Sequence, residues 1–155
     1  MSEQDTANWL DNHLRTYRGT DGAEGHIVDL SAWGGKPGTT TLLLRTIGRK
    51  SGRVLINPLI YLAVGDEYVI VASKGGAPEH PAWYLNLTAV PEVQFQVARD
   101  HFKGSWRVIQ GAERTATWDV LVDHFPPYAD YKAATDREIP IIALKAAETI
   151  PALEE

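Results

Sequence analysis

The fold is decided by residues 40–83, which read TTLLLRTIGRKSGRVLINPLIYLAVGDEYVIVASKGGAPEHPAW. Three β-prone apolar runs, Thr39–Ile47, Val54–Val64 and Tyr68–Ala72, enclose the basic segment Gly48–Arg53, and the second polar segment Ser73–Pro81 follows them. Because the runs are apolar at nearly every position, we expect both faces of these strands to be buried. Two glycine-containing basic loops at strand ends suggest that one anionic ligand is gripped from two sides.

Three further strands are expected outside this stretch, over Glu92–Ala98, His101–Ile109 and Ile139–Leu144. In the first of them Val93, Phe95 and Val97 alternate with Glu92, Gln94 and Gln96, which predicts an apolar inner face and a polar outer face. Pro58 lies inside the run Val54–Val64 and indicates an edge position or a bulge. About six sequential, mostly antiparallel strands buried on both faces favour a closed or partly closed barrel.

Helices are expected to cover the ends of this barrel. The periodicity predicts helices over Asp5–Tyr17 and Ala112–Phe125, a short helix with Pro81 at its first position, and a helical turn that places Tyr128 and Tyr131 on one side. The length of 155 residues indicates a single α+β domain. We expect an N-terminal helix and loop over residues 1–38, a barrel core over 39–144 and a tail over 145–155.

The charge distribution points to a local anion site. A net charge of −5 and a pI of about 5.5 argue against a dedicated nucleic-acid binder. From Leu30 to Gly65, however, the chain has no Asp or Glu, and this window contains the cations Lys36, Arg45, Arg49, Lys50 and Arg53. An acidic protein with such a window is expected to bind an anion there. The alternative is chance segregation of charges around solvated strand ends.

Several site classes are excluded or disfavoured. The chain has no cysteine, and its five histidines show no ligand spacing, so we expect no metal site. It contains no nucleophile elbow, no zinc-protease pair and no glycine-rich nucleotide loop, which suggests that a cofactor supplies the chemistry. No apolar run is long enough to span a membrane and no signal peptide is evident, so a cytoplasmic location is expected. The helix over Asp5–Tyr17 is compatible with weak peripheral association at the inner membrane surface, although its polar face is not strongly basic and packing is favoured.

A set of ordered motifs resembles the deazaflavin-dependent nitroreductase family. The motifs are Thr46-Ile47-Gly48-Arg49-Lys50-Ser51-Gly52, Asn57-Pro58-Leu59, Val71-Ala72-Ser73-Lys74-Gly75-Gly76-Ala77-Pro78, His80-Pro81-Ala82-Trp83-Tyr84-Leu85-Asn86-Leu87, Pro127-Tyr128-Ala129-Asp130-Tyr131 and Thr135-Asp136-Arg137-Glu138-Ile139-Pro140. The resemblance covers roughly residues 40–144. It implies a split β-barrel, similar to FMN-binding barrels, that binds coenzyme F420, a deazaflavin with a phosphodiester and a polyglutamate tail.

The resemblance also implies where the cofactor lies. Arg49, Lys50 and Ser51 would hold the phosphate end, with Arg53 carrying a further charge. The ring system would be flanked by Asn57, Pro58, Leu59, Ile60, Val71, Ala72, Ser73 and Lys74. The helix residues Ala82, Trp83, Tyr84 and Asn86, together with Tyr128, would pack near the ring or its side chain. For Trp83, a purely structural role as a core aromatic residue is an equal alternative.

Similar proteins transfer a hydride to quinones, activated alkenes (enones) or nitro compounds, and the candidate proton donors here are Ser73, Tyr128 and Tyr131. The two tyrosines could instead form an apolar wall. The chain departs from the family at two positions. Many members have an arginine where Leu55 stands, so Arg53 is expected to carry the second charge, and some have a tyrosine where Phe125 stands, which makes the substrate pocket more apolar.

Two other functions compete with a deazaflavin-dependent reductase. One is an FMN-dependent oxidoreductase on a similar barrel, and the other is a non-enzymatic protein that stores or carries the cofactor. The basic window fits all three, whereas the ordered motifs favour the first. Related deazaflavin enzymes can be monomers, so a monomer is favoured over a dimer.

Overall fold

The computed structural model describes residues 2–155. The helices are α1 (Glu3–Gly19), α2 (Ala82–Leu87), α3 (Gly111–His124) and α4 (Pro127–Ala133), with short 3-10 turns η1 (Ser31–Trp33) and η2 (Lys74–Gly76). The strands are β1 (Ile27–Val28), β2 (Thr39–Ile47), β3 (Val54–Ile60), β4 (Leu62–Val64), β5 (Glu67–Val71), β6 (Glu92–Val97), β7 (Asp100–Val108) and β8 (Ile141–Ile150).

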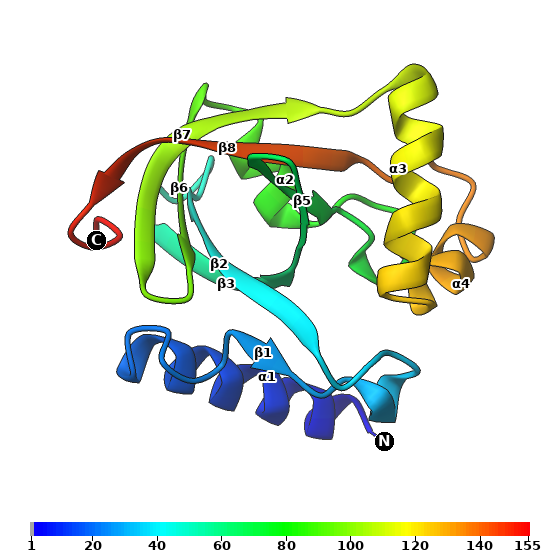
Figure 1. Cartoon of the computed structure of the whole chain (residues 1–155), viewed down its shortest axis with the longest axis horizontal. Helices are drawn as coiled ribbons and strands as arrows, with labels where there is room; N and C mark the ends of the chain where they lie inside the picture. The colour runs from blue at the N-terminus through cyan, green and yellow to red at the C-terminus, as the bar shows by residue number, and fades with distance from the viewer. Residues whose placement is uncertain (1) are drawn as a thin grey trace.

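The strands form one strongly curved antiparallel sheet in the order β1-β2-β6-β7-β8-β5-β4, and β3 pairs with the other edge of β2 (Figure 1). This arrangement confirms the α+β barrel class. Residues 2–155 form eight strands rather than about six, because residues 27–28 add a short strand and the run Val54–Val64 is divided in two.

The division of that run closes the barrel. Residues of β3 pair with β2, and after Tyr61 the chain continues as β4, which pairs with β5. The main chain of Tyr61 is still tied to β2, since its N–H donates to the carbonyl of Thr40 and its carbonyl accepts from the Thr40 hydroxyl. The phenol of Tyr61 lies 2.6 Å from Nε2 of His26. One bent segment therefore joins the two margins of the sheet.

Two expectations about strand positions are resolved by the pairing. Among residues 2–155, β3 pairs only with β2, so Pro58 lies on an edge strand where its missing N–H costs no ladder bond. The final strand, in contrast, was expected to end at Leu144, and it runs from Ile141 to Ile150 along β7. Residues 145–150 are therefore part of the sheet and not a tail.

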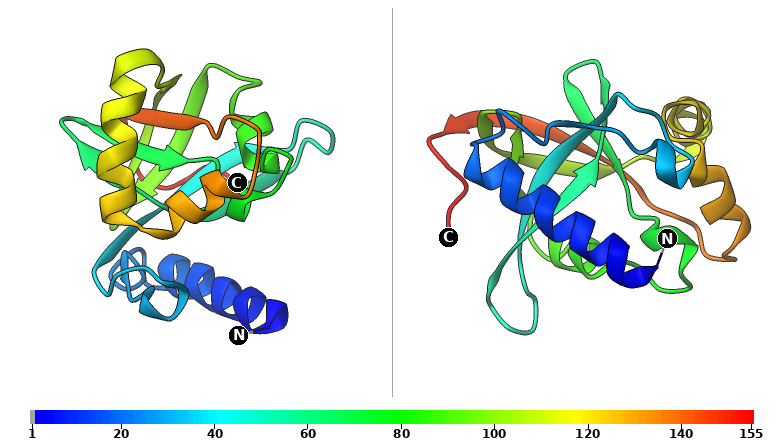
Figure 2. Two further views of the ribbon diagram at one scale, coloured as in Figure 1. Left: turned by 90° about the vertical axis from the view of Figure 1, so that its right-hand side faces the viewer. Right: turned by 90° about the horizontal axis from the view of Figure 1, so that it is seen from below.

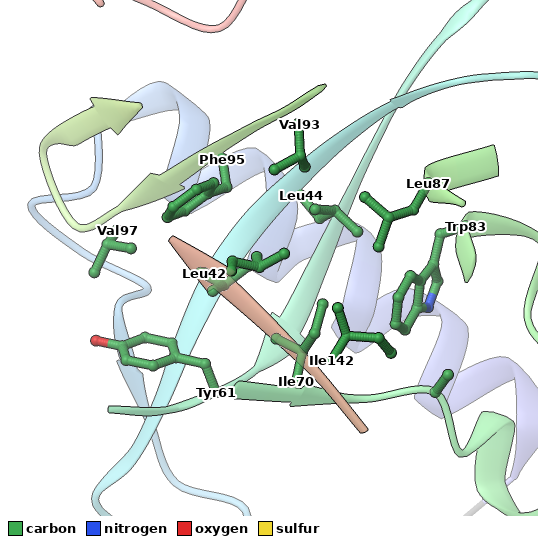
Figure 3. Packing of buried hydrophobic residues seen from close by; sticks show 12 residues of the cluster. Leu42, Leu44, Tyr61, Ile70, Trp83, Leu87, Val93, Phe95, Val97 and Ile142 are labelled. Atoms are coloured by element: carbon green, nitrogen blue, oxygen red, sulfur yellow. The ribbon is translucent and has the colours of Figure 1, made fainter. Parts of the chain in front are cut away.

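Side chains alternate between two apolar clusters on the two faces of the sheet. In β5, Ile70 points into the barrel interior while Val69 and Val71 face the helices, and β8 repeats this pattern with Ile142 and Ile141. The interior cluster contains Leu42, Leu44, Tyr61, Ile70, Ala72, Trp83, Leu87, Val93, Phe95, Val97, Ile142 and Leu144 (Figure 3). The expected burial of both faces is thus confirmed for these strands.

The outward face of β6 differs from its sequence pattern. Val93, Phe95 and Val97 face the interior as expected, but Gln94 and Gln96 are also buried, each only 4% exposed. The carboxamide of Gln94 accepts from the N–H of Glu154, and that of Gln96 donates to the carbonyl of Ala98. Polar residues are tolerated there because the C-terminal residues and the hairpin backbone satisfy their hydrogen bonds.

The helices were located correctly to within a few residues. α2 begins at Ala82, so Pro81 precedes the first helical residue instead of occupying it. α3 and α4 pack together over one end of the sheet, whereas α1 runs beneath β2 and β3 on the other side (Figures 1 and 2). The capping box of Ser2 and Asp5 begins α1.

Candidate active site

A cleft of about 310 Å³ lies between the sheet, α1, α2 and the aromatic residues that follow α3. Its volume is at the lower end of the roughly 300–1,000 Å³ that is usual for small-molecule sites, enough for a ring system but not for a long tail. Residues far apart in the sequence meet here, from Thr6 at the N-terminus to Tyr131 in α4.

Strands β3 and β5 contribute the floor of the cleft. Pro58, Leu59 and Ile60 of β3 line it, and Val71 lies opposite at the end of β5. These are four of the residues that the family resemblance assigned to the flanks of the deazaflavin ring. An apolar wall supplied by two strands suits a planar conjugated ring, which is held by burial of its faces.

The loop after β5 contributes the polar part of the cleft. Ser73, Lys74 and Gly75 line it, and the hydroxyl of Ser73 has no hydrogen-bond partner in residues 2–155 although the residue is only 9% exposed. The Lys74 ammonium group pairs with Glu79 at 2.7 Å. This loop therefore presents a free hydroxyl next to a cation that a surface carboxylate already holds in place.

An aromatic cluster closes the cleft from the side of α4. Phe125, Tyr128 and Tyr131 line it, with the ring of Phe125 4.9 Å from that of Tyr128 and the two tyrosine rings 6.3 Å apart. Burial raises the pKa of Tyr128, and burial together with Asp130 raises that of Tyr131. Neither hydroxyl bonds to another group in residues 2–155, so both are protonated donors that remain available to a ligand.

Trp83 belongs to the interior core cluster and also borders the cleft. It is 9% exposed, lines the cleft, and extends from α2 toward Leu87 and Ile142 in the barrel interior (Figure 3). The alternatives of a core aromatic residue and a site residue are therefore compatible in position, because Trp83 is a member of the interior cluster and also lines the cleft.

The N-terminal segment forms a wall that was not anticipated from the sequence. Trp9 and His13 of α1 line the cleft together with Trp33 of η1, and the two tryptophan rings lie 5.2 Å apart. Nε2 of His13 donates to the carbonyl of Gly25 at 2.8 Å, and burial lowers the pKa of His13. The amphipathic pattern of α1 indicated a buried face, but the pattern alone did not show that this face covers a cleft.

The basic hairpin Gly48–Arg53 does not line the cleft. It lies at the far end of β3, where the guanidinium and main-chain N–H of Arg49 both donate to Oδ1 of Asn86 at 3.1 Å. Within residues 2–155 no carboxylate forms an ion pair with Arg49, Lys50 or Arg53. Three exposed cations without a carboxylate partner are suited to binding an external anion.

Other predicted site residues also lie outside the cleft. The carbonyl of Ala72 accepts a hydrogen bond from the guanidinium of Arg137, and the ring of Tyr84 packs against that of His80 in a tilted arrangement with ring centres 4.9 Å apart. Asn57 on β3 and Ala82 on α2 do not border the cleft either. Ser51 is in the basic hairpin, where its hydroxyl accepts from the N–H of Arg53 at 3.2 Å. The other predicted residues fall into a cleft group and a group at the basic hairpin, whereas Asn57, Ala72, Ala82 and Tyr84 belong to neither.

Comparison with known proteins identifies relatives over nearly the whole chain. The family model described as F420H(2)-dependent quinone reductase matches residues 9–146. An F420H(2)-dependent quinone reductase of Mycobacterium tuberculosis is 34% identical in an alignment 152 residues long that covers 90% of this chain and 97% of that protein.

Solved structures agree with this assignment. An F420-H2 dependent reductase aligns with a TM-score of 0.62 at 36% identity over 77% of this chain and 98% of that one. A protein described as a domain-swapped dimer aligns with a TM-score of 0.64 at 32% identity over 90% of this chain and 99% of that one. The expectation of FMN has no support from these relatives. The chain belongs to the F420H(2)-dependent quinone reductase family, and the resemblance seen in its motifs is confirmed.

Proposed function

We propose that this enzyme reduces a quinone to a hydroquinone, using reduced coenzyme F420 as the electron donor. The coenzyme, when bound, supplies the hydride. The quinone gains that hydride and one proton and becomes the hydroquinone. The reduced coenzyme loses the same two electrons and two hydrogens and is oxidised. The observation that carries this proposal is the cleft itself, which combines apolar strands, an aromatic wall and three hydroxyl groups that have no hydrogen-bond partner within residues 2–155.

The residues of the cleft fit both a deazaflavin ring and an aromatic acceptor. Pro58, Leu59, Ile60 and Val71 offer apolar surface to the faces of a ring, while Trp9, Trp33 and Phe125 offer aromatic surface from the other sides. A quinone ring stacked against such a wall excludes water from the reacting atoms, which strengthens polar interactions inside the cleft.

The three hydroxyls would hold the oxygen atoms of the acceptor. Because burial raises the pKa of Tyr128 and Tyr131, their phenols stay protonated at neutral pH and can donate to an oxygen that gains negative charge. Ser73 can donate in the same way from the opposite loop. Hydrogen bonding of this kind stabilises the developing charge, and the same groups lie where a proton must be delivered.

The hairpin cations would bind the anionic tail of the coenzyme. Arg53 directly precedes β3, and Pro58 lies five residues further along the chain. Because an extended strand rises roughly 3.3 Å per residue, the hairpin lies about 17 Å from the cleft. A ring in the cleft with a phosphate-bearing tail along β3 would reach Arg49, Lys50 and Arg53. Asn86 fits this role indirectly, because it holds Arg49 in place.

A pair of charge variants tests the cofactor site. Lys50→Ala should raise the dissociation constant of F420 tenfold or more, since a charge-assisted contact is worth roughly 1.5–3 kcal/mol. Arg99→Ala is the matched control, because Arg99 is an exposed cation in the turn between β6 and β7. Titration of F420 fluorescence measures both. If the Lys50 variant and the wild type bind F420 with equal affinity, Lys50 is not part of the cofactor site.

A second pair separates substrate contact from cofactor contact. Tyr128→Phe should lower the turnover of a soluble naphthoquinone more than it weakens F420 binding, because the phenol oxygen is directed to the acceptor in this proposal. The same assay with an enone and a nitroaromatic acceptor determines whether those compounds are also substrates. If Tyr128→Phe instead weakens F420 binding and leaves turnover at saturating F420 unaltered, Tyr128 contacts the cofactor rather than the substrate.

We also propose that the enzyme is a cytoplasmic monomer that touches membranes only weakly. In residues 2–155 no helix is long and apolar enough to cross a membrane. Leu10 is the one large apolar side chain of α1 that is more than a third exposed, at 45%, and it lies at the border of the cleft beside Trp9 and His13. Light scattering gives the oligomeric state, and co-sedimentation of wild type and Leu10→Ser with anionic vesicles measures the membrane contact.

A further inference from the structure

The loop between β5 and α2 has an unusual backbone. Ser73 is right-handed helical with φ −79° and ψ −35°, and the next three residues all have positive φ, 46° at Lys74, 62° at Gly75 and 83° at Gly76. A positive φ is unfavourable for a lysine and requires support from the surroundings. The conformation of this loop is therefore imposed by contacts outside it.

This conformation matters because it prepares donors at the cleft. A right-handed residue followed by a left-handed one turns successive main-chain N–H groups toward one concavity, which favours a negatively charged oxygen. Within residues 2–155, no group accepts from the N–H of Ser73, Lys74 or Gly75, and all three residues line the cleft. The binding of a ligand oxygen in this concavity therefore depends on how firmly the loop is held in its conformation.

Arg137 contacts the loop from the side away from the cleft. Its guanidinium donates to three carbonyls, through Nε to Ala77 at 2.8 Å, through Nη1 to Ala72 at 3.2 Å and through Nη2 to Ser73 at 2.7 Å. Nη1 also lies 3.0 Å from Nδ1 of His80. One side chain thus ties both ends of the loop together.

No carboxylate in residues 2–155 forms an ion pair with Arg137, and the residue does not border the cleft. Four hydrogen bonds to one segment require the planar, fork-shaped guanidinium, which a lysine ammonium group cannot imitate. The side chain is half-buried, so these bonds are shielded from competition by water.

We propose that Arg137 is a positioning residue for the reaction: it holds the Ser73–Gly75 backbone in the shape that receives an oxygen of the bound ligand. This inference rests on the proposed function for the identity of the ligand. The geometry of the loop itself does not depend on that function, so the two ideas can fail separately.

The test compares three variants, Arg137→Ala, Arg137→Lys and, as the matched control, Arg114→Ala. Arg114 lies near Arg137, but its guanidinium pairs at 3.0 Å with the exposed Glu138. Both Arg137 variants should lose on the order of 10-fold or more in kcat for F420H2-dependent quinone reduction, as expected when charge-assisted hydrogen bonds are lost. Arg114→Ala should stay within about twofold of the wild type. Guanidinium ion at millimolar concentration should restore a large part of the rate of Arg137→Ala and nothing in Arg137→Lys.

Amide hydrogen exchange of residues 73–77, measured without any ligand, is the second readout. Exchange should accelerate in both Arg137 variants and slow again in Arg137→Ala when guanidinium is added. If the role of Arg137 is merely structural, the Arg137 variants will have a lower melting temperature, but kcat measured well below that temperature will be unchanged and guanidinium will have no effect. That outcome would overturn the proposal. If Arg137→Ala does not fold, Arg137→Lys decides by its kcat and its amide exchange alone: a wild-type kcat would overturn the proposal. If the wild type lacks quinone reductase activity, the proposed function fails. The role of Arg137 in holding the loop is then still decided by the amide exchange rates and by their response to guanidinium.

Discussion

The buried phenol of Tyr17 attaches α1 to the barrel, and removing its oxygen should have a large effect. The side chain is fully buried, its hydroxyl donates to the carbonyl of Thr41 at 2.9 Å, and it accepts from the N–H of Ala98 at 2.8 Å. The Ala98 N–H has no other acceptor in residues 2–155. Tyr17→Phe keeps the ring and its packing but removes the partner of the buried Thr41 carbonyl and of the part-buried Ala98 N–H.

The size of the effect follows from these two groups. An unsatisfied buried polar group costs about 1–3 kcal/mol, so the variant should lose about 2–4 kcal/mol of unfolding free energy. For a chain of this length each 1 kcal/mol shifts the melting temperature by about 2–4 °C, which gives a decrease of roughly 6–12 °C for a loss near 3 kcal/mol. Because Trp9 and His13 on the same helix line the cleft, the KM for the quinone should rise as well.

Thermal unfolding followed by circular dichroism measures the first effect, and steady-state kinetics with a soluble naphthoquinone measures the second. Tyr68→Phe is the matched control, because Tyr68 packs against the same barrel core and its hydroxyl has no hydrogen bond within residues 2–155. That variant should melt within about 2 °C of the wild type. A Tyr17→Phe protein that also melts within 2 °C of the wild type would refute the reasoning.

Three further outcomes follow from the structure. Gly104→Ala should unfold at a clearly lower denaturant concentration than the wild type, because a Cβ at the register shift in β7 would overlap the carbonyl of Lys145. Asn86→Ala should weaken F420 binding in a fluorescence titration and leave the quinone KM at saturating F420 unchanged, since its amide oxygen holds the basic hairpin and lies outside the cleft. Burial lowers the pKa of His26 and His124, so the folded state binds fewer protons than the unfolded state below about pH 6.5. The melting temperature should therefore fall as the pH decreases from 6.5 to 5, and His26→Gln should flatten that decrease.

The strands could be predicted from the sequence because each carries its own local signal. The run Thr39–Ile47 was located to the residue, and the alternation in Glu92–Val97 correctly identified its inner face. The extension of the last strand to Ile150 could not be read in this way. Residues 145–150 have a weak strand pattern, and they join the sheet because β7 offers a partner edge, including the bulge at Gly104.

The residues that line the cleft could likewise be predicted only in part from the sequence. Ser73, Trp83 and Tyr128 were predicted as site residues from their motifs, and the structure brings all three to one cleft. Trp9 and Trp33 have no comparable motif. An amphipathic helix shows that one face is buried but not which surface buries it, so the contribution of α1 needed the three-dimensional arrangement.

The distance between the cleft and the basic hairpin leads to a last prediction, about additivity. If the hairpin holds the tail of the coenzyme and the cleft holds the reacting rings, Lys50 and Tyr128 act on different parts of one bound complex. Sites separated by more than about 7–10 Å without shared partners have nearly additive effects, with coupling below roughly 0.5 kcal/mol. The loss of kcat/KM in Lys50→Ala/Tyr128→Phe should then equal the product of the two single losses to within about a factor of two. A much larger coupling would mean that the tail contact is used to orient the ring, and the division between a binding hairpin and a reacting cleft would have to be abandoned.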